Sequence, residues 1–120
     1  MITTSTKKHN TQKLVTLYHV TTSESLNSIF KQGLIPQVGD NAFDCGEKKP
    51  AIYFFPTKDT MNDALGGWMG DLLEDNGEDG YCLTVHVPVD QVQDSTVDWE
   101  KLSYQPVAPE NIEKEVKRVW

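Results

Sequence analysis

The 120-residue sequence predicts an α+β domain with several strands and two helices. Segments rich in β-branched and aromatic residues outnumber the segments with helical periodicity. The two predicted helices do not alternate with strands in the regular manner of a doubly wound sheet. Hydrophobic residues make up 38% of the chain and charged residues 24%, which is typical of a globular domain with its own core.

The first predicted strand, Leu14 to Val20 (LVTLYHV), leads directly into a helix from Ser23 to Gln32. Thr21 and Glu24 have the T-x-x-E spacing of a capping box, and Gly33 supplies the helix stop. Spacings of three and four residues predict one apolar face on this helix, made of Leu26, Ile29 and Phe30.

A second strand and helix follow residues 37–50, which have the composition of a loop. The short apolar run AIYFF, Ala51 to Phe55, predicts a buried strand that Pro56 ends. Thr57 is placed to cap a helix from Lys58 to about Leu73. Its inner side is expected to carry Met61, Ala64, Leu65, Trp68 and Leu72.

Strands are also expected in the C-terminal part of the chain. Tyr81 to Val89 (YCLTVHVPV) alternates between apolar and polar residues, so His86 is expected on the polar face. Asp90 to Asp98 is a predicted polar turn region. A strand over Glu100 to Tyr104, a proline-bounded turn and a last strand within residues 113–120 complete the expected fold.

Length and charge limit the classes of protein that the sequence fits. We expect one domain over residues 14–120, preceded by a flexible N-terminal arm over residues 1–13. The arm has no apolar signal segment and the chain has no long apolar run, so a cytoplasmic protein without a membrane partner is expected. The net charge of −7 argues against tight binding of nucleic acid, which requires clustered cations.

Cysteine usage and acidic residues add two smaller expectations. Cys45 and Cys82 are too few and too far apart for a disulfide framework or a zinc site, so no metal is expected. Much of the negative charge lies in residues 70–80 (GDLLEDNGEDG), which has the composition of a solvated loop.

Three residues are candidates for a functional site because of where they fall in these elements. His19 ends the first strand, Tyr53 lies inside the AIYFF strand, and Glu100 begins a late strand. Each also has an ordinary structural interpretation: a polar strand end, a core tyrosine and a solvated glutamate. Taken separately, none of the three identifies a function.

Taken in order with their flanking segments, they resemble the ADP-ribosyltransferase fold. The resemblance is to its His–Tyr–Glu branch, which is diphtheria-toxin-like and PARP-like, and to small bacterial or phage members. The matching segments are LYHVT with GLIP, AIYFF with PTKDTMNDAL, YCLTVHVPV and EKLSYQPVAPENI, which together span Leu17 to the C-terminus. The resemblance implies a split β-sheet core with two helices and NAD as a co-substrate.

The resemblance also implies a role for each candidate residue. Cleavage of the bond between nicotinamide and ribose passes through an oxocarbenium-like state, which a carboxylate such as Glu100 stabilises. The Tyr53 ring would stack on the cationic nicotinamide, a contact worth about 0.5–2 kcal/mol. His19 would hydrogen-bond the adenosine-side ribose, and with Val20 and Thr21 it would form the floor of the NAD pocket.

Two points concern the glutamate. A shifted strand register would bring Gln105 or Glu110 to the pocket in place of Glu100, and a glutamine there would imply weak or absent transferase activity. Arginine-modifying members of the family have a glutamate or glutamine two residues before the catalytic one. Here that residue is Asp98, so arginine specificity is not expected.

The leading functional prediction is a mono-ADP-ribosyltransferase that modifies a macromolecular target, protein or nucleic acid, for example as a toxin or phage effector. Residues 37–50 would close over NAD, and residues 70–80 would help to select the target. One alternative is a catalytically weak or inactive binding or inhibitor module with the same fold. Transfer of an RNA 2′-phosphate to NAD is a further alternative, disfavoured because only 11 Lys and Arg are present. The last alternative is an α+β domain that is unrelated to this family.

Overall fold

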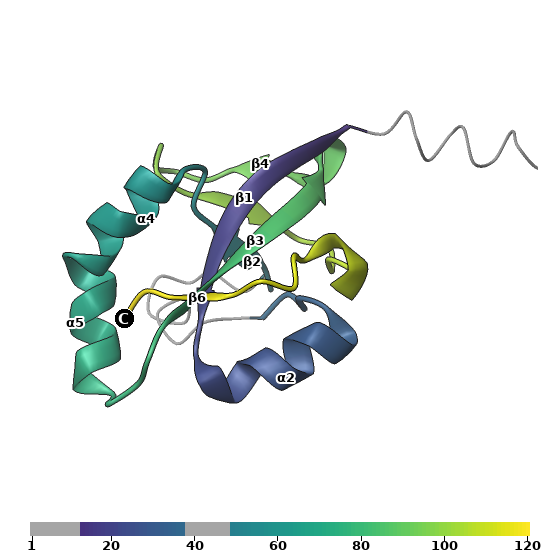
Figure 1. Ribbon diagram of the computed structural model, residues 1–120. Coiled ribbons are helices and arrows are strands. Elements are labelled where there is room, and N and C mark those ends of the chain that lie inside the picture. Colours follow the sequence, from purple (N-terminus) through teal and green to yellow (C-terminus); the bar gives the residue numbers. More distant parts are fainter. Residues whose placement is uncertain (1–12, 38–48) are drawn as a thin grey trace, which may run out of the picture.

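Two small antiparallel sheets and three α-helices make up residues 13–37 and 49–120, the part of the chain that the computed structural model describes (Figure 1). The first sheet has the order β1–β3–β6, with β1 at Leu14–Thr21, β3 at Tyr81–Pro88 and β6 at Lys117–Arg118. The second has the order β2–β5–β4, with β2 at Ile52–Phe54, β5 at Lys101–Ser103 and β4 at Gln93–Asp94. The helices are α2 (Ser23–Gln32), α4 (Lys58–Leu65) and α5 (Trp68–Asp75), and two 3₁₀ turns are η1 (Val89–Gln91) and η2 (Pro109–Asn111). The predicted α+β class is confirmed.

The longest pairing joins β1 to β3 along their full lengths, from Leu14 opposite Pro88 to Thr21 opposite Tyr81. Side chains alternate between two faces along each strand, and one face of this pair is buried in the main core. The core includes Leu17, Ile29, Leu34, Ile52, Phe54, Leu83, Val85, Val87, Val107 and Ile112. His86 points to the opposite, partly exposed face, as its alternation predicts.

The two sheets meet where β1 passes the end of β2. Tyr18 and Phe55 form an antiparallel bridge, with N–H to carbonyl distances of 3.0 Å and 2.8 Å in the two directions. Figure 1 shows α4 and α5 on one side of the β1–β3 pair and α2 below it. The next residue of β1, His19, therefore lies at the junction of the two sheets.

The first helix has its predicted length but not its predicted N-terminal cap. The residue before it is Thr22, which makes no side-chain cap, so the capping box of Thr21 and Glu24 is wrong. Instead the N–H of Ser23 donates to Asp79 Oδ1 at 2.9 Å, from a turn far along the chain. At the other end the stop is as predicted, because Gly33 has φ 84° and its N–H donates to the Ile29 carbonyl.

The second predicted helix, Lys58 to Leu73, is two helices instead of one. Thr57 caps α4 as expected, in a reciprocal arrangement with Thr60. The chain then breaks at Gly66 and Gly67, two residues with low helix propensity, before α5 begins. The fold therefore has three α-helices in its described part where two were predicted.

The break changes which residues of this segment are buried. Met61, Ala64 and Leu65 are buried as predicted, but Trp68 and Leu72 are 49% and 50% exposed. Within α5 it is Gly70 and Leu73 that face the core. The prediction of an inner Trp68 and Leu72 was wrong because it extended one helical phase across the glycine pair.

Some weaker predictions also need correction. Residues 90–98 are not only turn, since they contain part of η1 and the short strand β4. The last strand is confined to Lys117–Arg118, and residues 70–80 are partly helix α5 rather than loop. The predicted arm, except Lys13, and most of the loop expected to close over NAD lie outside the described residues. Within the described ranges, no helix has the length and apolarity that a membrane span requires.

Substitution of Gly33 tests how strictly the end of α2 requires glycine. Its φ of 84° lies in the left-handed region, and an added Cβ would collide with the Val107 carbonyl oxygen. Gly33→Ala is therefore expected to lower the free energy of unfolding by about 2 kcal/mol or more. Urea denaturation of purified protein measures the effect.

Gly77 supplies the matched control for this substitution. It also has a positive φ, 65°, but a Cβ there would meet no atom within 4 Å. Gly77→Ala should cost only about 1 kcal/mol, from backbone strain alone. Equal destabilisation by the two substitutions would contradict the role given to the Val107 contact.

Candidate functional site

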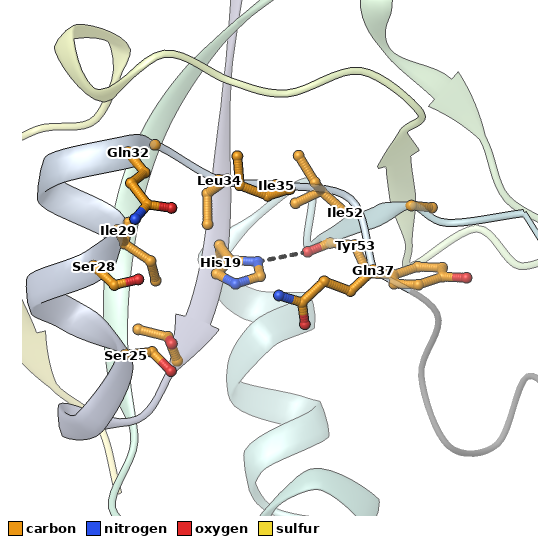
Figure 2. Close-up of a pocket in the computed structure, with 13 residues that line it drawn as sticks. His19, Ser25, Ser28, Ile29, Gln32, Leu34, Ile35, Gln37, Ile52 and Tyr53 are labelled. Carbon is orange, nitrogen blue, oxygen red and sulfur yellow. Dashed lines mark hydrogen bonds between the residues drawn. The ribbon is translucent and has the colours of Figure 1, made fainter.

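A pocket of about 340 Å³ lies between α2 and the chain that runs through residues 33–37 and into β2 (Figure 2). Helix α2 contributes polar side chains to it, those of Ser25, Ser28 and Gln32. The remaining lining residues are His19, Thr21, Ile29, Gly33, Leu34, Ile35, Gln37, Ala51, Ile52 and Tyr53. Its size is at the lower end of the range of small-molecule sites.

His19 lies inside this pocket, between α2 and β2 (Figure 2). Its Nδ1 lies 2.8 Å from the carbonyl oxygen of Tyr53, and its ring meets Phe54 edge-on with centroids 5.9 Å apart. A carbonyl oxygen only accepts hydrogen bonds, so Nδ1 carries the proton and donates. In the neutral ring Nε2 is then an acceptor.

The His19 ring is held in its neutral form. Burial of the ring lowers the pKa of His19 below its ordinary value, and the hydrogen bond to the Tyr53 carbonyl opposes this effect without cancelling it. Part of the residue's surface remains exposed, so a ligand in the pocket can reach it. His19 is therefore a fixed hydrogen-bond acceptor rather than a cation near neutral pH.

Tyr53 faces away from the core. Its neighbours Ile52 and Phe54 are 3% and 1% exposed, whereas Tyr53 is 39% exposed. Successive strand residues point to opposite faces, so the buried neighbours direct Tyr53 outward. The interpretation of Tyr53 as a core residue is excluded. Tyr53 is among the lining residues of the pocket, its carbonyl oxygen accepts the His19 hydrogen bond, and its ring is directed away from α2 (Figure 2).

A second, smaller pocket of about 100 Å³ shares His19 and Tyr53 with the walls of the first. Glu100 lines this second pocket, together with Val20, Phe54, Phe55, Trp68 and Met69. His19, Tyr53 and Glu100, chosen from separate parts of the sequence, therefore meet at one cavity. Their chemical roles stay predictions.

The pairing of β2 with β5 explains the position of Glu100. Phe54 lies opposite Lys101 in this antiparallel pair, so the preceding Glu100 falls near Phe55, at the junction of the sheets. Gln105 and Glu110, the alternatives to Glu100, are exposed and are not among the residues of either pocket.

The Glu100 carboxylate is held by a hydrogen bond from its own hairpin. The hydroxyl of Ser95 donates to Glu100 Oε1 at 2.7 Å, and Ser95 follows β4, the partner strand of β5. The cation nearest to Glu100 in sequence is Lys101, which forms an ion pair with Asp94, with Nζ and Oδ1 2.6 Å apart. Asp98, two residues before Glu100, is exposed.

The other two predicted NAD-binding residues also lie at the cavity. Val20 lines the smaller pocket and Thr21 the larger one. Both follow His19 at the end of β1, and because side chains alternate along a strand they point to opposite faces, one toward each pocket.

Sequence analysis missed several residues of the site. Ser25, Ser28 and Gln32 recur at helical spacing on the polar side of α2, a signal that was present in the sequence. Trp68 and Met69 reach the smaller pocket only because the helix breaks before them. Trp99 stacks on Phe55, with ring centroids 6.5 Å apart, and so adjoins the same wall.

Other reactive groups of the described residues lie elsewhere. Cys82 is buried, and burial raises the pKa of its thiol against the opposing effect of Lys58 and Lys117. His86 is paired with Glu113 at 2.8 Å and lines neither pocket. Within residues 13–37 and 49–120, no group of three His, Cys, Asp or Glu residues is arranged to hold a metal ion.

Comparison with known proteins adds no relative. No family model matches the chain, and no curated protein or solved structure matches it significantly. The candidate site is therefore interpreted from its own residues.

The neutral state of buried His19 predicts a dependence of stability on pH. Because its folded pKa is below the ordinary value of 6.5, the unfolded chain binds more protons as the pH falls through this region. The contribution of His19 is complete above pH 6.5 and is lost as the pH falls toward the folded pKa, by at most about 1.4 kcal/mol per pH unit.

His19→Asn isolates this effect, because an asparagine amide can donate to the Tyr53 carbonyl but does not titrate. Urea denaturation at pH 7.5 and 5.5 should show a smaller loss of stability in the variant than in the wild-type protein. An equal loss in both would show that His19 does not titrate differently on folding.

Proposed function

We propose that this protein is an NAD-dependent mono-ADP-ribosyltransferase that modifies a macromolecular target. The observation that supports the proposal is the meeting of His19, Tyr53 and Glu100 at one cavity, although they were selected from the sequence alone. NAD is a co-substrate in this proposal, and its ADP-ribose part is transferred.

The geometry suits the roles that this chemistry requires. Glu100 is a carboxylate at the base of the smaller pocket, where it would stabilise the positive charge that develops on the ribose. The exposed Tyr53 ring would stack against the nicotinamide. The Nε2 of neutral His19 is oriented to accept a hydrogen bond from a ribose hydroxyl, because Nδ1 is held by the Tyr53 carbonyl.

The walls of both pockets also fit a nucleotide. The larger pocket presents two hydroxyls and an amide on α2, from Ser25, Ser28 and Gln32, beside the apolar Ile29 and Ile35. These groups suit ribose hydroxyls and a flat base better than a bare phosphate. No Lys or Arg is among the described residues that line either pocket.

The absence of cations from these walls bears on the RNA 2′-phosphotransferase alternative. That activity requires positive charge to hold an RNA phosphate. The described lining residues offer one negative charge, Glu100, and none of the opposite sign. The NAD diphosphate also lacks a cationic partner in these walls, so this observation disfavours a bound RNA phosphate without by itself favouring NAD, and an inactive binding module remains an outcome of the tests below.

Glu100→Gln tests the catalytic proposal. The substitution keeps the oxygen that accepts the Ser95 hydrogen bond but removes the negative charge, so the pocket should stay intact. Nicotinamide release from NAD and labelling of lysate proteins by labelled NAD are both expected to fall about 100-fold or more. Glu110→Gln, at an exposed position in η2, is the matched control and should retain both.

If wild-type protein and Glu100→Gln release nicotinamide and label targets equally, Glu100 is not catalytic. If neither protein shows activity while NAD still binds, the chain is a binding module with the same pocket.

NAD binding itself is measurable by thermal shift. A ligand that binds only the folded state at 100 times its dissociation constant adds about 2.7 kcal/mol of stability. Tyr53→Ala and His19→Ala should each remove most of the NAD-dependent rise in Tm. Tyr104→Ala, at an exposed tyrosine outside both pockets, should leave it unchanged. A shift that survives both site substitutions would place NAD elsewhere.

A further inference from the structure

A groove of about 230 Å³ adjoins the candidate site on the side of α4 and α5. It is lined by Thr60, Asp63, Ala64, Trp68 and Trp99, and we refer to these residues as the tryptophan groove. Trp68 also lines the smaller pocket with Glu100, and Trp99 directly precedes Glu100 in the chain. The groove therefore shares the wall residue Trp68 with the pocket where transfer would occur.

The two indole rings form an unusual exposed surface. Trp68 is 49% and Trp99 38% exposed, and their ring centroids lie 5.9 Å apart with an interplanar angle of 44°. Trp99 is supported from behind by the buried Phe55, on which it stacks. Two supported aromatic faces at an open groove are suited to bind a flat group or a cation.

The charges around the groove decide between these ligands. Among the described residues of its wall, Asp63 is the one that carries an ionisable group. The two helices that carry Asp63 and Trp68 have one lysine, Lys58, against a larger set of carboxylates: Asp59, Asp63, Asp71, Glu74 and Asp75. With a net charge of −7 on the whole chain, the surface favours a cation and repels phosphate.

We infer that the tryptophan groove docks an arginine side chain from a basic segment of the protein target. A guanidinium is both flat and cationic, so it stacks on the indole faces while its N–H groups pair with the Asp63 carboxylate. A lysine ammonium is cationic but has no flat face to stack on an indole ring. A nucleobase has a flat face, but the nucleic acid that carries it also brings negatively charged phosphates.

This inference concerns where the target docks and leaves open which of its groups is modified. As a target subsite it rests on the proposed transferase function, but arginine binding in the groove does not. The two are therefore measured separately.

Fluorescence anisotropy of labelled peptides tests the groove in the absence of NAD. The probe is a fluorescein-labelled peptide of alternating glycine and arginine, compared with matched glycine–lysine and glycine–glutamate peptides and an oligothymidylate. The arginine peptide should bind tightest, roughly threefold tighter than the lysine peptide, and its affinity should fall with added salt. The glutamate peptide should not bind.

Substitutions then locate the binding. Trp68→Ala is expected to weaken arginine-peptide binding about tenfold, and Trp68→Phe to restore part of it. Asp63→Asn should weaken binding roughly threefold. Leu72→Ala, an equally exposed apolar residue of α5, and Asp75→Asn, at the end of the same helix, are matched controls and should change the affinity less than about twofold.

Thermal unfolding of each variant separates lost binding from lost folding, and Trp68→Phe keeps the test decisive if Trp68→Ala unfolds. The inference is wrong if the arginine peptide binds no better than the glutamate peptide, or equally well without the Trp68 ring. Tighter binding of oligothymidylate would instead indicate a nucleic-acid ligand. If the peptide binds but no nicotinamide is released, the groove inference stands and the transferase proposal is wrong. If nicotinamide is released but the peptide does not bind, the transferase proposal stands and the groove inference is wrong.

Discussion

The pair of backbone hydrogen bonds between Tyr18 and Phe55 is the constraint on which the site depends. It joins the β1–β3 sheet to the β2–β5 sheet next to His19, a residue that lines both pockets. One residue further along β1, the His19 side chain bonds the Tyr53 carbonyl, which extends the contact between the sheets. The β2–β5 register then brings Glu100 beside Phe55. A single junction thus positions residues that lie far apart in the sequence.

This junction also sets the chemistry of His19. Burial of the ring lowers the pKa of His19 although the bond to the Tyr53 carbonyl raises it, and the same bond fixes the proton of the neutral ring on Nδ1. The same bond that ties the sheets therefore presents Nε2 as an acceptor. His19 thus contributes to the junction through Nδ1 and, under the proposed function, to ligand recognition through Nε2, so its substitution is expected to affect both. The comparison with His19→Asn is informative because the amide preserves the bond and removes the titration.

The sequence predicts elements well where the signals are local. Strand β1, helix α2 and its glycine stop follow from patterns within a few residues. The cap of α2 does not, because its acceptor is Asp79, which the chain brings back from a distant turn. The direction of the Tyr53 side chain could not be predicted either, since a short apolar run has no alternation of apolar and polar residues to show which face is buried. The choice of Glu100 over Gln105 depends on the β2–β5 register, a long-range pairing.

The glycine pair at Gly66 and Gly67 breaks the predicted helix and changes which side chains are exposed. A continuous helix would have placed Trp68 and Leu72 on its buried side, where their apolar area would stabilise the fold by about 1.5–3 kcal/mol per side chain. The break instead leaves both half exposed and brings Trp68 beside Trp99 and the Glu100 pocket. Leu72 lines neither pocket of the candidate site, so its exposure is a consequence of the helix break alone. Trp68, by contrast, lines both the largely apolar Glu100 pocket and the tryptophan groove, and this shared position is what the proposed docking of a target depends on.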